Sequence, residues 1–146
     1  MKRIQLLPVL AAAALTALAL TGCSSIIEQV QREKSLEFAS VPILTEEWDQ
    51  PADWLPADAT QITIREEAAG GGPAILAVTT NSDLDPMQCA ETDRQSAPTY
   101  AEDWSPDDVY VDRVFACANW AVIKIADGWY GWTPNDPDEM AVSPAQ

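Results

Sequence analysis

The clearest alternation of apolar and polar residues lies in the last third of the chain, where three runs read as strands. These runs are VYVDRVFAC, WAVIKIA and WYGWT. Asp127-Gly128, between the last two, is a typical two-residue hairpin turn and would place Ile125 opposite Tyr130. The reverse side of that hairpin carries Trp120, Val122, Lys124 and Trp129. Because both sides hold bulky side chains, we expect a covering layer on each face of the sheet.

A second hairpin is predicted in the middle of the chain. QITIRE alternates with Ile62 and Ile64 on one face, and AILAVTT is a second, more buried run. A glycine cluster at residues 70–72 connects the two runs. We therefore expect an α+β fold, a small antiparallel sheet of about five strands with one or two short helices.

The segments before the first hairpin lack strand periodicity. Residues 24–40 carry apolar side chains at roughly helical spacing, which predicts either a short helix or a tether. Residues 41–59 mix prolines with acidic residues, so we expect an irregular segment whose Trp48 and Trp54 dock onto the domain.

Two later segments are predicted to be irregular. Residues 81–108 are rich in proline and polar residues and read as loop, with at most one short helix around 85–92 that contains Cys89. No periodic apolar pattern follows Pro134, so residues 135–146 are predicted to be a disordered acidic tail.

The N-terminus has the layout of a secretory signal peptide. Lys2 and Arg3 precede a mostly apolar run that ends at Leu20. A transmembrane helix is the alternative, but the run is about 17 residues, at the lower limit for spanning a bilayer, and no basic cluster follows it. A signal peptide is therefore the better interpretation.

The end of that run, Leu20-Thr21-Gly22-Cys23, resembles the lipobox of bacterial lipoproteins. The resemblance implies cleavage after Gly22 and lipid attachment to Cys23, which would become the first residue of the mature chain. An ordinary signal peptide with an accidental cysteine is the alternative. Two or more acyl chains would hold the protein stably at a membrane, since each buried methylene adds about 0.8 kcal/mol. The expected location is the outer, extracytoplasmic face of the cell membrane.

The charge of the mature chain limits its partners. Removing residues 1–22 leaves six basic and 23 acidic residues, a formal charge of −17. Nucleic acid is excluded as a partner because phosphate neutralisation needs clustered lysine and arginine. Docking on anionic headgroups is disfavoured for the same reason, so the covalent lipid must provide the membrane attachment. A basic partner or cations are the complements that remain.

Once Cys23 is assigned to lipid, Cys89 and Cys117 remain. An export signal places them where disulfides persist, so we expect them to pair. A zinc site is excluded because the chain has no histidine, and a redox-active pair is disfavoured because no Cys-x-x-Cys spacing occurs.

Candidate chemistry in the rest of the chain is sparse. Without histidine, most nucleophile–base pairs are impossible, and catalysis would depend on paired carboxylates. Asn81, Asp83 and Asp85 start like a calcium loop, but Pro86 and Thr92 stand where that loop needs glycine and glutamate. We therefore predict no enzymatic activity, no cofactor and no metal site.

The six tryptophans could form a platform for sugar rings, but in a small domain they are more simply explained as core. If any contact a ligand, Trp104 in the long loop and Trp129 beside the turn are the candidates. The stretch WLPADATQI, residues 54–62, resembles the start of the folded part in small uncharacterised exported proteins of high-GC Gram-positive bacteria, and that resemblance implies a small α+β domain without functional residues.

These observations predict four parts: a signal peptide over 1–22, a lipidated segment over 23–45 that is either a tether or a short helix, one disulfide-containing α+β domain over 46–134, and a disordered tail over 135–146. The expected function is a non-enzymatic binding or interaction role at the cell envelope, performed by a monomer. The alternatives are a module that binds glycan or a divalent cation, or an inhibitor or interaction protein for a basic partner. A carboxylate hydrolase is the least favoured.

Overall fold

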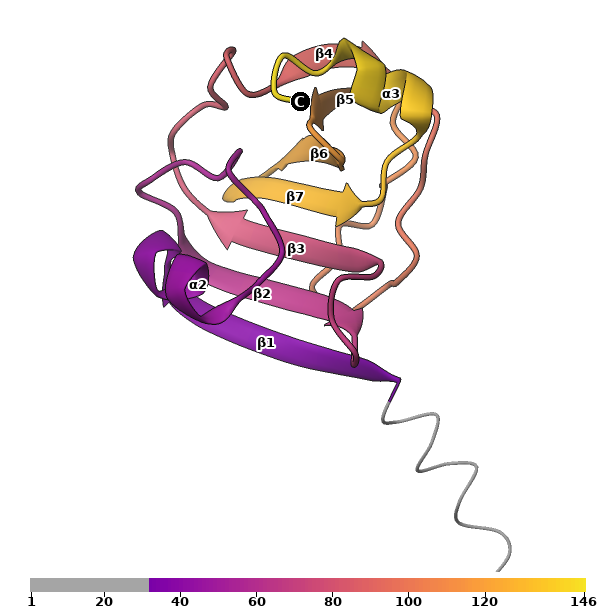
Figure 1. The fold of residues 1–146 in the computed structure, drawn as a ribbon. Helices are drawn as coiled ribbons and strands as arrows, with labels where there is room; N and C mark the ends of the chain where they lie inside the picture. Colours follow the sequence, from indigo (N-terminus) through magenta and orange to yellow (C-terminus); the bar gives the residue numbers. More distant parts are fainter. Residues whose placement is uncertain (1–31) are drawn as a thin grey trace, which may run out of the picture. The chain divides into compact units, whose positions relative to one another are not determined.

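The computed structural model describes residues 32–146, which form an antiparallel sheet with two short helices (Figure 1). Its strands are β1 Glu33–Ser40, β2 Thr60–Glu67, β3 Ala74–Thr79, β4 Ala90–Asp93, β5 Arg113–Cys117, β6 Trp120–Ile125 and β7 Gly128–Thr133. The helices are α2 Val41–Glu47 and α3 Pro137–Val142. The seven strands lie in the order β1-β2-β3-β7-β6-β5-β4, and every neighbouring pair is antiparallel. The expected five-stranded α+β fold is therefore wrong, because the described part is mostly β.

Strand β1 is the first of the two strands that the sequence pattern did not predict. Leu36 and Phe38 alternate with polar residues and lie opposite Ile64 and Ile62 of β2. Alternation over so few apolar residues is also compatible with helical spacing, and the pairing with β2 decides the conformation. The helix or tether expected over residues 23–45 is thus corrected from Glu33 onward, and the domain begins before residue 46.

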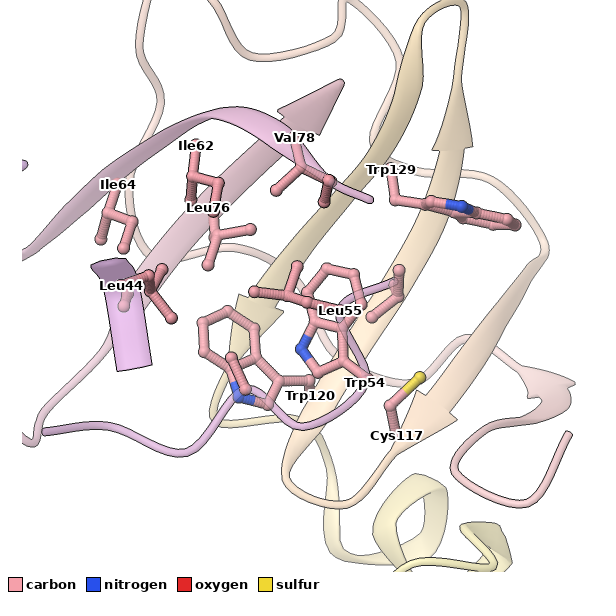
Figure 2. Close-up of a cluster of buried hydrophobic side chains, with 14 of the residues drawn as sticks. Leu44, Trp54, Leu55, Ile62, Ile64, Leu76, Val78, Cys117, Trp120 and Trp129 are labelled. Carbon is pink, nitrogen blue, oxygen red and sulfur yellow. The ribbon is translucent and has the colours of Figure 1, made fainter. Parts of the chain in front are cut away.

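One face of the sheet, which we call face A, is covered by α2 and by the irregular segment 48–59. Trp48 and Trp54 are buried there as predicted, and their rings lie 6.1 and 5.9 Å from that of Trp120. Figure 2 shows Trp54 and Trp120 at the centre of this cluster. Gly131 leaves the space for Trp54, since a Cβ on Gly131 would lie 2.9 Å from that ring.

The opposite face, face B, is covered by the loop that joins β4 to β5. Tyr130 and Trp132 are fully buried there, and Trp104 packs at 6.2 Å from the Tyr130 ring. Burial raises the pKa of Tyr130 above its ordinary value, and a hydrogen bond with Ser105 partly opposes that shift. The prediction that both faces are covered is confirmed.

The last hairpin has the predicted faces but not the predicted register. Ile125 lies opposite Gly128, and residues 126 and 127 form the turn, so the pairing is shifted by two residues. An even shift leaves every side chain on its expected face. Gly128 is needed inside β7 because a Cβ there would lie 2.0 Å from the carbonyl oxygen of Val78. That close approach to β3 cannot be read from the hairpin alone.

Residues 81–108 contain strand β4 instead of a short helix. A turn at 86–88 precedes it, and β4 pairs with β5 from Ala90 opposite Ala116 to Asp93 opposite Arg113. With only four residues and alternating half-exposed side chains, β4 has little apolar pattern of its own. Its conformation depends on the strand beside it.

The C-terminal segment is ordered in the structure, which corrects the disordered tail expected over 135–146. Helix α3 begins with a capping box. The Asp136 carboxylate accepts from the backbone N–H of Glu139, and the Glu139 carboxylate accepts from the backbone N–H of Asp136. Glu139 is fully buried, and its carboxylate accepts hydrogen bonds from the backbone and hydroxyl of Ser96. Hydrogen bonds to a buried carboxylate, and not an apolar stripe, attach the segment to the domain. The sequence therefore shows no periodic apolar pattern there.

The predicted disulfide between Cys89 and Cys117 is present and lies in the face A core. Cys117 pairs with Trp120 across the Ala118-Asn119 turn. Ser143, which follows α3, bridges the two cysteine segments: its hydroxyl accepts from the Ala118 N–H at 2.7 Å and contacts the Gln88 carbonyl at 3.3 Å. The C-terminal segment therefore covers the disulfide.

Candidate functional site

A pocket of about 540 Å³ lies on face A beside strand β1. Three parts of the chain form it: β1 with the facing end of β2, the segment that follows α2, and the loop between β2 and β3. Its lining residues are Lys34, Leu36, Glu37, Phe38, Glu47, Trp48, Asp49, Gln50, Glu66, Ala69, Gly70 and Gly71. We call this the β1 pocket.

The deepest polar group of the β1 pocket is the carboxylate of Glu66, which is 1% exposed. One oxygen accepts from the Trp48 indole N–H at 2.9 Å and from the Gln50 amide at 3.0 Å. The other oxygen lies 3.1 Å from the ammonium of Lys34. A buried carboxylate is tolerated only when its charge and lone pairs are satisfied, and these three donors do so.

Lys34 is the exposed half of this ion pair, with 43% of its side chain accessible. It therefore lies between the buried carboxylate and solvent. The pair's Coulomb energy is partly screened by solvent at that exposure.

The rim of the pocket is acidic. Glu47 and Asp49 are exposed, and neither forms an ion pair within residues 32–146. Glu37 also borders the pocket, but its side chain lies on face B by the alternation along β1. The side chains that line the pocket on face A therefore include three carboxylates and one ammonium. The pocket therefore attracts positive charge.

The apolar part of the pocket comes from β1, and the opposite wall from a glycine loop. Leu36 and Phe38 point to face A and pack on the core. Gly70 and Gly71 have φ of 74° and 73°, a conformation that glycine adopts without steric cost. Gln50 links the two sides, because its amide also donates to the Gly72 carbonyl at 3.2 Å.

The residues that the sequence nominated lie elsewhere. Cys23 lies outside the described residues. Trp104 is half-buried against Tyr130, and Trp129 is only 4% exposed. The Trp129 indole N–H donates to the Ser82 carbonyl, and Lys124 covers its ring at 4.3 Å. Trp129 therefore belongs to the face A core and Trp104 packs on face B, and a ligand contact of either ring stays a prediction.

The acidic stretch 81–85, which starts like a calcium loop in the sequence, precedes a turn in the structure. Asp83 and Asp85 are exposed, and Asp85 accepts a hydrogen bond from the Met87 N–H at 2.8 Å, which closes the turn at 86–88. Within residues 32–146 no group of three or more cysteine, aspartate or glutamate side chains is placed to hold a metal ion.

Sequence reasoning missed Lys34, Trp48 and Glu66, although one signal was present. In QITIRE the alternation that buries Ile62 and Ile64 places Glu66 on the same face, two residues further on. A glutamate whose side chain points to the buried face of a strand needs hydrogen-bond donors or a cation beside it. Those partners come from residues 18 and 32 positions earlier in the chain, so the pocket itself could not be read from the sequence.

Comparisons of the chain with protein-family models, with curated proteins and with solved structures found no match. Across residues 32–146, neither helix has the length and apolar character needed to cross a bilayer.

Proposed function

We propose that this chain is a membrane-anchored extracytoplasmic lipoprotein with a non-enzymatic binding role, and that the β1 pocket is its binding site. One observation carries the assignment of the site: a hollow in face A contains a buried carboxylate that is only partly screened by Lys34 and is surrounded by unpaired rim carboxylates. A concave site in which a few polar groups converge beside apolar side chains is a usual form of a binding site, and the β1 pocket combines Glu66 and its partners with Leu36 and Phe38.

The chemistry of the pocket favours binding over catalysis. A carboxylate hydrolase needs one acid and one base carboxylate facing each other across the substrate. In the β1 pocket the one buried carboxylate, Glu66, is engaged by three donors, while Glu47 and Asp49 are exposed to solvent. These groups can neutralise and orient a cation, which is a recognition role.

The position of Cys23 in the sequence supports presentation of this pocket at a membrane. Lys34 follows Cys23 by 11 residues. A chain of that length spans at most roughly 40 Å even when it is fully extended. Lipid on Cys23 would therefore keep the pocket within reach of other envelope components.

Metabolic labelling with a lipid precursor tests the anchor. Wild type is expected to incorporate label and to fractionate with membranes, whereas Cys23→Ser loses both. Cys89→Ala serves as the matched control, because it also removes one cysteine but leaves Cys23. Equal labelling of wild type and Cys23→Ser would refute the lipoprotein assignment.

A further inference from the structure

We propose that the outer edge of β1 and the β1 pocket together bind an extended, lysine- or arginine-rich peptide segment of another envelope protein, which adds to the sheet as a further strand. This inference rests on the proposed function, because it names the partner class of the same pocket. Addition of a peptide strand to a sheet edge is a recurrent recognition mode, in which the backbone provides affinity and alternate side chains provide specificity.

The first support is that β1 ends the sheet and is long. It pairs only with β2, and it runs for eight residues from Glu33 to Ser40. Among residues 32–146, no segment lies along its outer side (Figure 1). The other edge strand, β4, has four residues and lies against α3.

The second support is the direction of the β1 backbone groups. The Ala68 N–H donates to the Arg32 carbonyl, which makes residues 32 and 68 a hydrogen-bonded pair. In an antiparallel ladder such pairs alternate with pairs whose N–H and C=O groups point away from the partner. By that alternation Glu33, Ser35, Glu37 and Ala39 direct their backbone groups outward.

The third support is that the same alternation aims the side chains of an added strand into the pocket. Lys34, Leu36 and Phe38 place their side chains on face A, where they line the pocket. Residues of an added strand opposite these three would point to the same face. Every second side chain of the peptide would therefore stand at the mouth of the β1 pocket.

Charge decides which side chains fit there. Among residues 32–146, no cation pairs with the carboxylates of Glu47 and Asp49 at that mouth, and half-exposed Lys34 is the one cation at the Glu66 carboxylate. On face B of β1, Glu37 is unpaired, whereas Glu33 is paired with Arg65 at 2.8 Å. Lysine or arginine at alternate positions complements these carboxylates, except opposite Lys34, where an uncharged residue avoids a like-charge pair.

A second copy of this chain is the competing occupant of the edge. Two copies paired through β1 would bring two acidic pocket rims together, on mature chains that each have a formal charge of −17. Like charges across a strand pair destabilise it. The foreign basic segment is therefore favoured over self-association.

The test uses the purified full-length chain in non-ionic detergent and a synthetic peptide with alternating lysine and valine or threonine. Hydrogen exchange followed by NMR is the main readout. Saturating peptide is expected to slow exchange of the outward amides of Glu33, Ser35, Glu37 and Ala39, while the amides of β4 do not change. Unchanged exchange of these outward amides overturns the proposal.

Two altered peptides separate backbone pairing from charge. N-methylation of alternate amides removes donors from the peptide backbone, and is expected to weaken binding by more than about tenfold. Glutamate in place of lysine is expected to abolish binding. Equal binding of the N-methylated peptide, or of the acidic peptide, refutes strand addition by a basic segment.

Rim variants test the pocket. Glu47→Gln with Asp49→Asn is expected to weaken binding of the lysine peptide roughly fivefold, because two ion pairs that solvent partly screens are lost. Asp103→Asn with Asp107→Asn is the matched control: it removes the same charge from exposed positions of the loop after β4 and should leave binding unchanged. Equal weakening by both double variants would show a non-specific charge effect and overturn the site.

The same experiments distinguish this inference from the anchor. The Cys23→Ser chain is expected to bind the peptide as wild type does, so loss of lipid labelling and loss of peptide binding are separate results. Sedimentation of the free chain is expected to give a monomer. A dimer that the lysine peptide does not dissociate would assign the edge to a second copy and overturn the proposal.

Discussion

Glu139 offers a sharp test of whether the C-terminal segment is part of the fold. Its carboxylate is fully buried, and one oxygen accepts from the backbone N–H groups of Gln95 and Ser96. The other oxygen accepts from the Ser96 hydroxyl at 2.6 Å and from the Asp136 N–H at 3.1 Å. Through these bonds α3 is joined to the loop that covers face B.

The expected effect of Glu139→Ala follows from those contacts. The change leaves four donors without their acceptor, and each buried donor left unsatisfied costs about 1–3 kcal/mol. Water can reach part of this half-buried loop, so we count about two uncompensated groups and expect a loss of about 3 kcal/mol in the free energy of unfolding. At roughly 4 °C per kcal/mol, the Tm falls by about 12 °C.

Thermal and urea unfolding of the full chain measure this loss. Asp138→Ala is the matched control, because Asp138 is exposed and its carboxylate only complements the start of α3, a contribution of roughly 0.5 kcal/mol. A chain that ends at Pro134 should be at least as unstable as Glu139→Ala. If Glu139→Ala and the shortened chain both unfold with the wild type, the C-terminal segment contributes nothing and the reasoning fails.

Three further predictions concern the pocket, acid stability and the disulfide. Lys34→Met should lower the free energy of unfolding by about 1 kcal/mol and Glu66→Gln by about 2 kcal/mol, because Lys34 is half-exposed whereas Glu66 is buried. A double-mutant cycle measured by urea unfolding that shows no coupling between the two residues would contradict the ion pair. Hydrogen bonds from Thr80 and Ser82 lower the pKa of Asp58 below its ordinary value of 3.8 in the folded chain. Its stabilisation is therefore present above that ordinary value and is lost as pH falls through the lowered pKa, so the difference in unfolding free energy between wild type and Asp58→Asn should vanish in acid; a difference that grows as pH falls has the wrong sign. Replacing both Cys89 and Cys117 by alanine removes a cross-link of sequence separation 28 and should cost about 3 kcal/mol in chemical denaturation, whereas an unchanged urea midpoint would argue against its structural role.

The strong strands of the sheet could be predicted because their side chains carry the pattern. The runs that form β2, β3, β5, β6 and β7 alternate or are continuously apolar, so each run by itself predicts burial of at least one face. The cysteine pair could also be predicted, since an export signal leaves two thiols where disulfides persist.

The two edge strands could not be predicted in the same way. β1 contains only Leu36 and Phe38 as large apolar residues, and β4 contains none. Such strands exist because a neighbouring strand offers unpaired backbone groups. The count of five strands was therefore too low at the two edges of the sheet.

The buried glutamates show most clearly what only tertiary structure decides. In the sequence Glu66 and Glu139 are two of 23 acidic residues. The alternation of QITIRE is the one local signal that separates Glu66 from solvated glutamates, and no pattern of its neighbours separates Glu139. In the fold each is enclosed by donors from distant segments, Trp48 and Lys34 for Glu66 and residues 95–96 for Glu139.

By itself, then, the sequence determined the periodic strands, the faces of the last hairpin, the pairing of Cys89 with Cys117 and the strong negative charge. The lipid on Cys23 remains its prediction. Tertiary structure alone decided the edge strands, the order of the C-terminal segment and the β1 pocket. The physical reason is that a repeated apolar pattern is a local property, whereas a buried charge or an edge strand is stabilised by partners that the chain brings together only on folding.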